Sequence, residues 1–405
     1  MIIDAATERS PSATDPRVAV TDVECSSVDM SVTFASGRVG VFNRFWLRDN
    51  CPTNGDRASL FRPFSVADLD DALRIGRATV GDHGAGIEVE FSDGTVDHFT
   101  AEFLDRHTSD VAGASAGASE RRHRVGATTA RFGLDDLNEP GAHHGLLEAV
   151  SMSGFAVVDQ LDDVGDIERL AALLGPIRET DFGRIFEIVS EPDPFTPSQS
   201  ESALDPHTDD PYRYSPAGVS ILHCVSPCDG SGGASTIVDG FAIAEMIAEV
   251  DPEAFTLLST ISVPYEHRRR DAVHQGDAIH LRAEAPVIAL DAAGSVCGIR
   301  FHERAMAPLR LSADVADRFY RALIRFARAV RSGEFTFTHH LRAGEAIVYD
   351  NQRVLHGRTE IAGPARRHLR LCTVDRDQVH SRLRLLRERH APGTESAPLP
   401  AGNLS

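Results

Sequence analysis

The chain has 405 residues, with 41 Lys and Arg against 60 Asp and Glu, so its formal net charge at pH 7 is −19. A surface this acidic lacks the basic patches that bind nucleic acid or anionic membranes, which argues against both as partners. With 42% hydrophobic and 25% charged residues, the composition is that of a globular protein of two or three domains.

The sequence also predicts where the protein resides. No apolar run approaches the roughly 18 residues that a membrane span needs, and the N-terminus lacks the basic and apolar regions of a secretory signal. The six cysteines are irregularly spaced, which disfavours a disulfide framework. We therefore expect a cytoplasmic protein.

Composition divides the chain into two domains. Small residues and a basic cluster between 109 and 129 (including VAGASAGASERRHR) are typical of a linker. The linker separates a first domain, 17–108, from a larger second domain, 130–390. The last residues, 391–405, are rich in Pro, Ala and Ser and are predicted to form a loose tail.

The first domain contains an internal repeat. Residues 32–42 (VTFASGRVGVF) recur as residues 89–99 (VEFSDGTVDHF). Each copy alternates apolar and polar residues around Ser-Gly or Asp-Gly, which is typical of a hairpin with a tight turn. We predict a small β-rich domain with two similar hairpins.

The second domain mixes helices and strands. Apolar spacing predicts helices over 144–153 and 166–174, with a short buried strand between them at 154–158. Beyond residue 200, strand-like runs dominate, and helical patterns interrupt them. The predicted strands are 219–224, 234–238, 287–290, 299–301, 346–349 and 369–374, and the predicted helices are 242–250, the segment after Asp251-Pro252, and 313–330. The fold class is therefore α+β, a sheet-rich core with helices outside it.

One short motif indicates chemistry. His207 and Asp209 are two residues apart, so on an extended strand their side chains point to the same face and can bind one ion. With a second histidine they would form a 2-His-1-carboxylate set, which suits non-haem Fe(II). The H-x-D pattern alone is weak evidence, because such short patterns arise by chance.

The C-terminal half supplies candidates that complete this set. His356 lies in a strand-turn-strand pattern, and Arg367 begins an apolar, strand-like run eleven residues later. A buried arginine needs an anion, and its guanidinium matches a carboxylate bidentately. That anion is either an organic acid bound to the metal or a protein carboxylate such as Glu345 or Asp350.

Several motifs in the same order resemble one enzyme family. FNRFWLRDNCP, HTDD-PYRYSPAGVSILHC, GGASTIVDGF, YDNQRVLHGR and SRLRLLRER are similar to segments of the γ-butyrobetaine and trimethyllysine hydroxylases. These enzymes are Fe(II)/2-oxoglutarate dioxygenases of the taurine dioxygenase-like group. The resemblance spans nearly the whole chain.

The resemblance implies a fold, cofactors and site residues. The catalytic domain would be a double-stranded β-helix (jelly roll) with flanking helices. Its cofactor and cosubstrates would be Fe(II), 2-oxoglutarate and O₂, with His207, Asp209 and His356 as catalytic metal ligands. Arg367 and Ser235 would bind 2-oxoglutarate. The family resemblance also favours a homodimer.

In two places the sequence departs from the family pattern. Family members commonly bind zinc in the first domain through three cysteines after the WLRDN motif, whereas only Cys51 is present here. We therefore expect no zinc there. The aromatic cage that holds a trimethylammonium group is reduced to Phe182 and Phe186, which Tyr212 and Tyr214 could supplement.

The anionic end of the substrate also differs from the family pattern. His302 and Glu303 stand where the family usually has an asparagine that helps to bind the substrate carboxylate. Arg213, His302 and Arg304 are candidate contacts for a carboxylate or a phosphonate. We predict oxidation of a small quaternary-ammonium substrate, by hydroxylation or by desaturation or rearrangement. The alternatives are the same chemistry on an unrelated small metabolite and a non-catalytic binding protein with this fold.

Overall fold

The computed structural model describes residues 16–51, 65–108, 129–189, 197–228, 231–269, 278–362 and 366–390. The chain divides into two compact units, Met1–Ser115 and Ala116–Ser405. Most of the predicted linker, 109–128, and the whole predicted tail, 391–405, lie outside the described residues. Among the described helices, none is long and apolar enough to span a membrane.

The first unit consists of two three-stranded antiparallel sheets, and the sequence repeat lies in the corresponding hairpins of the two sheets. Gly37 and Gly94 occupy the two hairpin turns with the same φ of 83°, a conformation that favours glycine. Each hairpin leads into a short helix whose first turn is capped by Asn43 or Thr100. The elements are β1 (Val20–Cys25), β2 (Asp29–Phe34), β3 (Val39–Asn43), α1 (Arg44–Asp49), β4 (Ile75–Val80), β5 (Gly86–Phe91), β6 (Val96–Thr100) and α2 (Ala101–Arg106).

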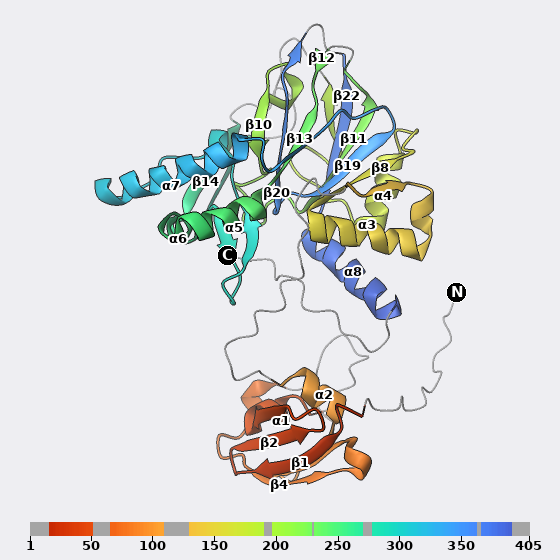
Figure 1. Ribbon diagram of the computed structural model, residues 1–405, viewed down its shortest axis with the longest axis vertical. Helices are drawn as coiled ribbons and strands as arrows, with labels where there is room; N and C mark the ends of the chain where they lie inside the picture. Colours follow the sequence, from red (N-terminus) through yellow and green to blue (C-terminus); the bar gives the residue numbers. More distant parts are fainter. Residues whose placement is uncertain are drawn as a thin grey trace. The chain divides into compact units, whose positions relative to one another are not determined.

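The second unit is built around a six-stranded sheet, here called the major sheet (Figure 1). Adjacent strands in this sheet are antiparallel, except for β7 and β8, which are parallel. In spatial order its strands are β7 (Arg131–Gly133), β8 (Phe155–Asp159), β19 (Glu345–Asp350), β11 (Val219–Ser226), β22 (His368–Val374) and β9 (Phe186–Val189).

A four-stranded antiparallel sheet, here called the minor sheet, contains the two predicted metal-binding histidines. Its order is β10 (Leu204–His207), β20 (Val354–Arg358), β13 (Ser235–Asp239) and β18 (Thr336–His339). Apolar residues of both sheets form one cluster, with Ile347 and Tyr349 from the major sheet and Ile237 and Phe337 from the minor sheet. This arrangement agrees with the expected α+β jelly roll.

Helices cover the other face of the major sheet. The alternate residues of its strands, such as Ile221 and Val348, pack with apolar residues of α3 (Pro140–Ser153), α4 (Asp166–Leu174) and α8 (Arg376–His390) (Figure 1). Pro140 at the first turn and Gly154 at the C-cap, with φ 82°, bound α3. Residues of the central strands of the major sheet therefore alternate between the other sheet and the helices.

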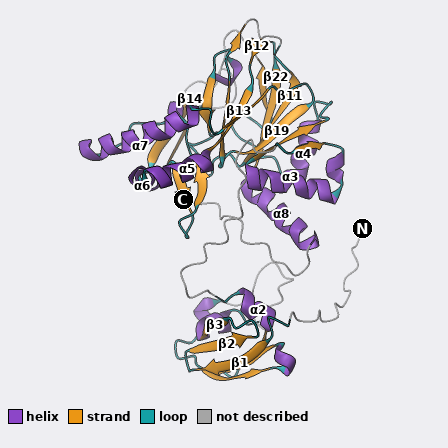
Figure 2. Cartoon of the chain, viewed as in Figure 1, coloured by secondary structure: helices purple, strands orange, loops and turns teal. Residues whose placement is uncertain are grey.

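A third apolar cluster of the second unit lies in the segment between β13 and β18. It joins α5 (Gly240–Val250), α6 (Pro252–Thr260) and α7 (Ala313–Arg331) to short antiparallel hairpins (Figure 2). These hairpins are β14 (Val263–Arg269) with β15 (Ile279–Ala285) and β16 (Ile288–Leu290) with β17 (Val296–Ile299). A further short pair joins β12 (Ser231–Gly232) to β21 (Ile361–Ala362).

Candidate active site

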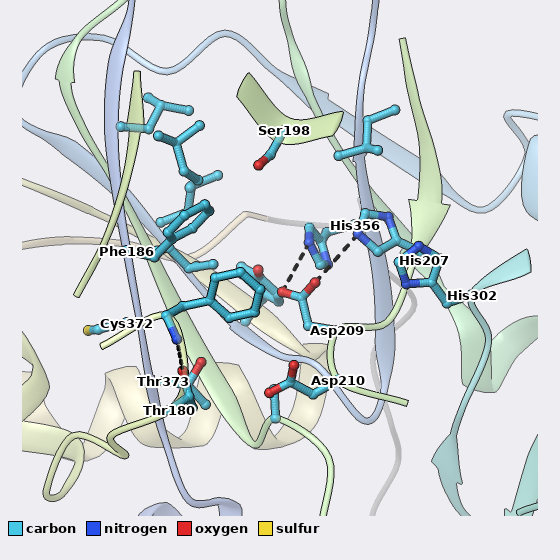
Figure 3. A pocket seen from close by; sticks show the side chains of 18 of the residues that line it. Thr180, Phe186, Ser198, His207, Asp209, Asp210, His302, His356, Cys372 and Thr373 are labelled. Atoms are coloured by element: carbon cyan, nitrogen blue, oxygen red, sulfur yellow. Dashed lines mark hydrogen bonds and ion pairs between the residues drawn. The ribbon is translucent and has the colours of Figure 1, made fainter. Parts of the chain in front are cut away.

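The structure brings together the three predicted metal ligands. His207 at the end of β10 pairs directly with His356 on β20, and Asp209 follows two residues after the strand. Nε2 of each histidine lies 3.5 Å from a carboxylate oxygen of Asp209, and one ligand atom from each residue lies within 4.8 Å of the others. Figure 3 shows the three side chains converging on one point.

Hydrogen bonds orient these ligands. Nδ1–H of His207 donates to the carbonyl oxygen of Asp205 at 2.8 Å, which leaves Nε2 to face Asp209. The side-chain oxygen of Asn351 accepts from the backbone N–H of Asp209 at 2.8 Å, and its amide group donates to the backbone oxygen of the same residue at 3.2 Å. The aromatic ring of Tyr349 packs on His356 at 4.8 Å between centroids.

The protonation states fit a divalent metal. Burial alone would raise the pKa of Asp209, but the neighbouring His356 and His207 hold it well below its usual range. Burial lowers the pKa of His356 to about 4, although Asp209 opposes this shift. At neutral pH Asp209 is therefore a carboxylate and His356 a neutral imidazole, the protonation states in which these side chains bind a metal. This donor set suits non-haem Fe(II).

The three metal ligands line one cavity of about 360 Å³, together with other residues of both sheets. Ser235 and Arg367, the predicted cosubstrate contacts, line it and are only 7% and 6% exposed. Asp350 pairs with Arg376, and Glu345 pairs with other cations, so neither is the partner of Arg367.

The same region contains a second buried arginine that sequence reasoning missed. Arg358 pairs with Ser235 in the sheet register and lines the cavity. Its guanidinium donates to the backbone oxygens of Ser198 and Ser200 at 3.1 and 2.8 Å, and Arg367 donates to Ser198 as well. Like Arg367, Arg358 lies within an apolar strand-like run, and this signal could have identified it.

Aromatic side chains line another part of the cavity. The rings of Phe182 and Phe186 lie 5.2 Å apart with an interplanar angle of 59°. Tyr212 stacks on His267 at 4.8 Å and donates its hydroxyl hydrogen to Asp210 at 3.0 Å. All five residues line the cavity. Sequence reasoning did not assign His267 to the site.

The structure separates the remaining predicted contacts into two groups. His302 and Arg304 line the cavity, and the His302 ring lies 4.4 Å from that of His207. Arg213 and Tyr214 are not among the described residues that line it. Arg213 forms ion pairs with Asp210 and Asp181, and Tyr214 is 87% exposed.

The fold and the metal site together define the class of protein, a non-haem iron oxygenase. Comparison with known proteins then gives the family. Residues 118–373 match the model of the taurine catabolism dioxygenase TauD, TfdA family, and the chain belongs to this family.

Three relatives illustrate this family membership. The chain is 34% identical to a gamma-butyrobetaine dioxygenase of Pseudomonas sp. (strain AK-1), over 88% of this chain and 93% of the relative. It is 26% identical to dioxygenase str8 of Strobilurus tenacellus, over 84% of each chain. It is 33% identical to the mitochondrial trimethyllysine dioxygenase of Bos taurus, over 54% of this chain and 51% of the relative. The protein is a dioxygenase that uses Fe(II), 2-oxoglutarate and O₂.

Proposed function

We propose that the enzyme oxidises a C–H bond of a small substrate with a quaternary ammonium group at one end and a carboxylate or phosphonate at the other. The observation that carries the proposal is the tilted pair of Phe182 and Phe186 in the same cavity as the metal ligands. The names of the relatives, which include a betaine and trimethyllysine, support the same substrate class.

The aromatic part of the cavity suits a trimethylammonium group. A quaternary ammonium group has no N–H to donate, so it is held by aromatic faces and by apolar contact rather than by hydrogen bonds. Burial lowers the pKa of His267, so this neighbouring ring is neutral and does not repel a cation. Phenylalanine binds a cation less strongly than tryptophan does, so we expect modest affinity for the ammonium group.

Arg304 is the best placed arginine for the anionic end. Arg178 donates to backbone oxygens and pairs with Asp375, and Arg358 is held by serine carbonyls. Arg304 is exposed, lines the cavity and forms no ion pair with any described residue. Together with His302 it offers hydrogen-bond donors for a carboxylate or a phosphonate.

In this assignment the protein residues bind and orient the reactants. Arg367 and Ser235 hold the distal carboxylate of 2-oxoglutarate, while His207, Asp209 and His356 hold the iron. Bound iron and cosubstrate supply the oxidant that removes hydrogen from a C–H bond. The substrate contacts decide which C–H is near enough to react. Whether hydroxylation, desaturation or rearrangement follows depends on this placement.

The test compares a cationic probe with a neutral one. The probes are γ-butyrobetaine and its carbon isostere, in which a tert-butyl group replaces trimethylammonium, and succinate formation is measured. Phe182→Leu and Phe186→Leu should each raise KM for the cationic probe by about 2- to 30-fold, because a cation–π contact contributes roughly 0.5 to 2 kcal/mol. KM for the neutral probe should change by less than about twofold, because leucine preserves the apolar contact.

Equal effects on the two probes would contradict the cation-binding role and favour an unrelated small metabolite as substrate. His207→Ala is the reference variant for the metal site. It should lose both iron binding and succinate formation, and retained turnover would contradict the ligand assignment.

A further inference from the structure

A row of three hydroxyl groups crosses the major sheet beside the metal ligands. In the sheet register, Ser220 on β11 pairs with Tyr349 on β19 at one side and with Thr373 on β22 at the other. Directly paired residues face the same side of a sheet, and Tyr349 and Thr373 both line the cavity. The hydroxyl oxygens of Ser220 and Thr373 are 3.1 Å apart.

The next inward-facing row along the same strands is entirely apolar. Leu222 pairs with Ile347 and with Leu371, and Leu371 pairs with Phe186. The three hydroxyls therefore form a polar strip beside an apolar one. The ring of Tyr349 packs in the apolar cluster between the two sheets, and only its hydroxyl contributes to the polar strip.

Tyr349 carries a buried hydroxyl beside the metal ligands. Its side chain is 1% exposed, and its ring is held against His356. The phenolic oxygen is buried and lies near the Ser220 hydroxyl, but it forms no hydrogen bond of normal geometry with any described residue. A buried hydroxyl without a normal hydrogen bond costs folding free energy, so phenylalanine would be the better residue here if stability alone mattered.

The cosubstrate anchored at Arg367 does not reach the whole strip. Arg367 directly precedes β22, whereas Thr373 lies near the other end of that strand. At about 3.3 Å per residue the two positions are roughly 20 Å apart along the strand, which exceeds the length of a five-carbon dicarboxylate. In Figure 3, Thr373 and His302 are drawn on opposite sides of the metal ligands.

We infer that the hydroxyls of Tyr349 and Thr373 bind an uncharged oxygen of the substrate, a hydroxyl or a carbonyl, and thereby fix which carbon faces the metal. The inference rests on the proposed function and adds a third recognition element to it. The ammonium group is assigned to the phenylalanine pair and the anion to Arg304. The hydroxyl strip is therefore left for an oxygen between the two ends.

Ligand binding to the holoenzyme tests this inference without relying on turnover. The protein is loaded with Fe(II) and 2-oxoglutarate without oxygen, and the shift of the visible band of the iron–cosubstrate chelate is followed. The probes are γ-butyrobetaine and its 3-hydroxy and 3-oxo derivatives, which differ at one carbon. Tyr349→Phe and Thr373→Val remove one hydroxyl each, and Tyr320→Phe on α7, where the side chain is 46% exposed, is the matched control.

The wild type should bind at least one oxygen-bearing probe more tightly than γ-butyrobetaine. Tyr349→Phe should weaken that binding by about tenfold, as expected for one lost hydrogen bond, while γ-butyrobetaine binding changes by less than about twofold. Thr373→Val should act in the same direction, and Tyr320→Phe should change nothing. Equal losses for probes with and without the oxygen would overturn the inference.

The melting temperature of the substrate-free holoenzyme is the second readout. Tyr349→Phe should leave it unchanged or raise it, since a buried hydroxyl without a normal hydrogen bond is removed. A lower melting temperature would assign the hydroxyl to the fold and overturn the inference. If no cationic probe shifts the band of the wild type, the proposed function fails. The inference, which rests on that function, then fails with it, whereas a band that shifts equally for probes with and without the oxygen overturns the inference alone.

Discussion

Asn351 holds the one carboxylate ligand by its backbone rather than by its side chain. It is fully buried and bonds to both the N–H and the carbonyl oxygen of Asp209. A further hydrogen bond joins its amide group to the carbonyl oxygen of Ala217 at 3.1 Å. Asn351 therefore connects the loop after β10 to the start of β11 and sets where the Asp209 carboxylate lies.

Replacing this residue should weaken metal binding without removing a ligand. We expect Asn351→Ala to reduce Fe(II) affinity by about 10- to 100-fold, the usual effect of losing a residue that orients a metal ligand. Anaerobic Fe(II) titration measures this effect. The control is Gln352→Ala. Its side chain forms one long hydrogen bond among the described residues, to the carbonyl oxygen of Ala217 at 3.4 Å, and its loss should change affinity by less than about threefold. Equal affinities in the wild type and Asn351→Ala would contradict the assignment.

Sequence reasoning named the three residues that the structure brings together, because their evidence is local. His207 and Asp209 share one short motif, and His356 and Arg367 lie in recognisable strand patterns. The same reasoning offered Arg213 as a contact for the anionic end of the substrate and Tyr214 as a supplement to the aromatic cage. The backbone turns at Asp210 with a φ of 54°, and beyond it Arg213 pairs with carboxylates while Tyr214 faces solvent. Residue types alone do not predict this change in chain direction at Asp210.

Glu345 links elements of the two sheets. Located at the start of β19, it accepts hydrogen bonds from Arg131 on β7 at 3.0 Å and from His339 on β18 at 2.9 Å. The backbone N–H and guanidinium of Arg342 contact it as well. Burial raises the pKa of Glu345, but these donors together lower it to about 2.

This network should make stability depend on pH. The folded pKa lies below the unfolded value of 4.5, so the stabilisation is complete above pH 4.5 and is lost as pH falls toward 2. Glu345→Gln should lower the free energy of unfolding by about 2 to 3 kcal/mol at pH 7, and the difference from the wild type should shrink in acid. Denaturant unfolding at several pH values measures this.

The control variant for that series is Glu284→Gln, which alters a pair with Arg282 whose side chains are 56% and 48% exposed. An exposed pair contributes little, so this variant should stay close to the wild type at every pH. A difference between Glu345→Gln and the wild type that does not change with pH would contradict the assigned pKa.

At the scale of elements, sequence patterns predicted the long helices and the buried strands, but not the short strands. The predicted helix at 166–174 and the predicted strand at 369–374 agree with α4 and β22 to within one residue. Strands β9, β10 and β18 have four residues each and were missed. Their sequences show no clear alternation, and tertiary pairing rather than intrinsic preference makes them strands.

Each unit of the molecule has an apolar core of its own. In the first unit, Met30, Phe34, Ile87 and Phe91 belong to a cluster that also contains Cys51. Burial and the neighbouring Asp97 raise the pKa of Cys51 to about 12, so its thiol is protonated and packs as an apolar side chain. The absence of zinc from this unit stays a prediction, as does the homodimer.

Metal removal tests the zinc prediction on the whole protein. A chelator should abolish turnover, and added Fe(II) should restore it. The melting transition of the first unit should not move, because packing rather than a metal holds that unit together. Elemental analysis of the purified protein together with calorimetry measures both properties. Stoichiometric zinc that survives purification, or a first unit that melts earlier with chelator, would contradict the prediction.

The alternation of side chains across the major sheet has a consequence for how this enzyme could acquire new substrates. Positions such as Leu222, Leu371 and Thr373 face the cavity, whereas their neighbours Ile221 and Val374 pack under the helices. Selection can therefore act on every second residue of a strand while the helix-packed residues stay unchanged. A mutant library restricted to cavity-facing positions would explore altered substrate preference with little loss of folded protein.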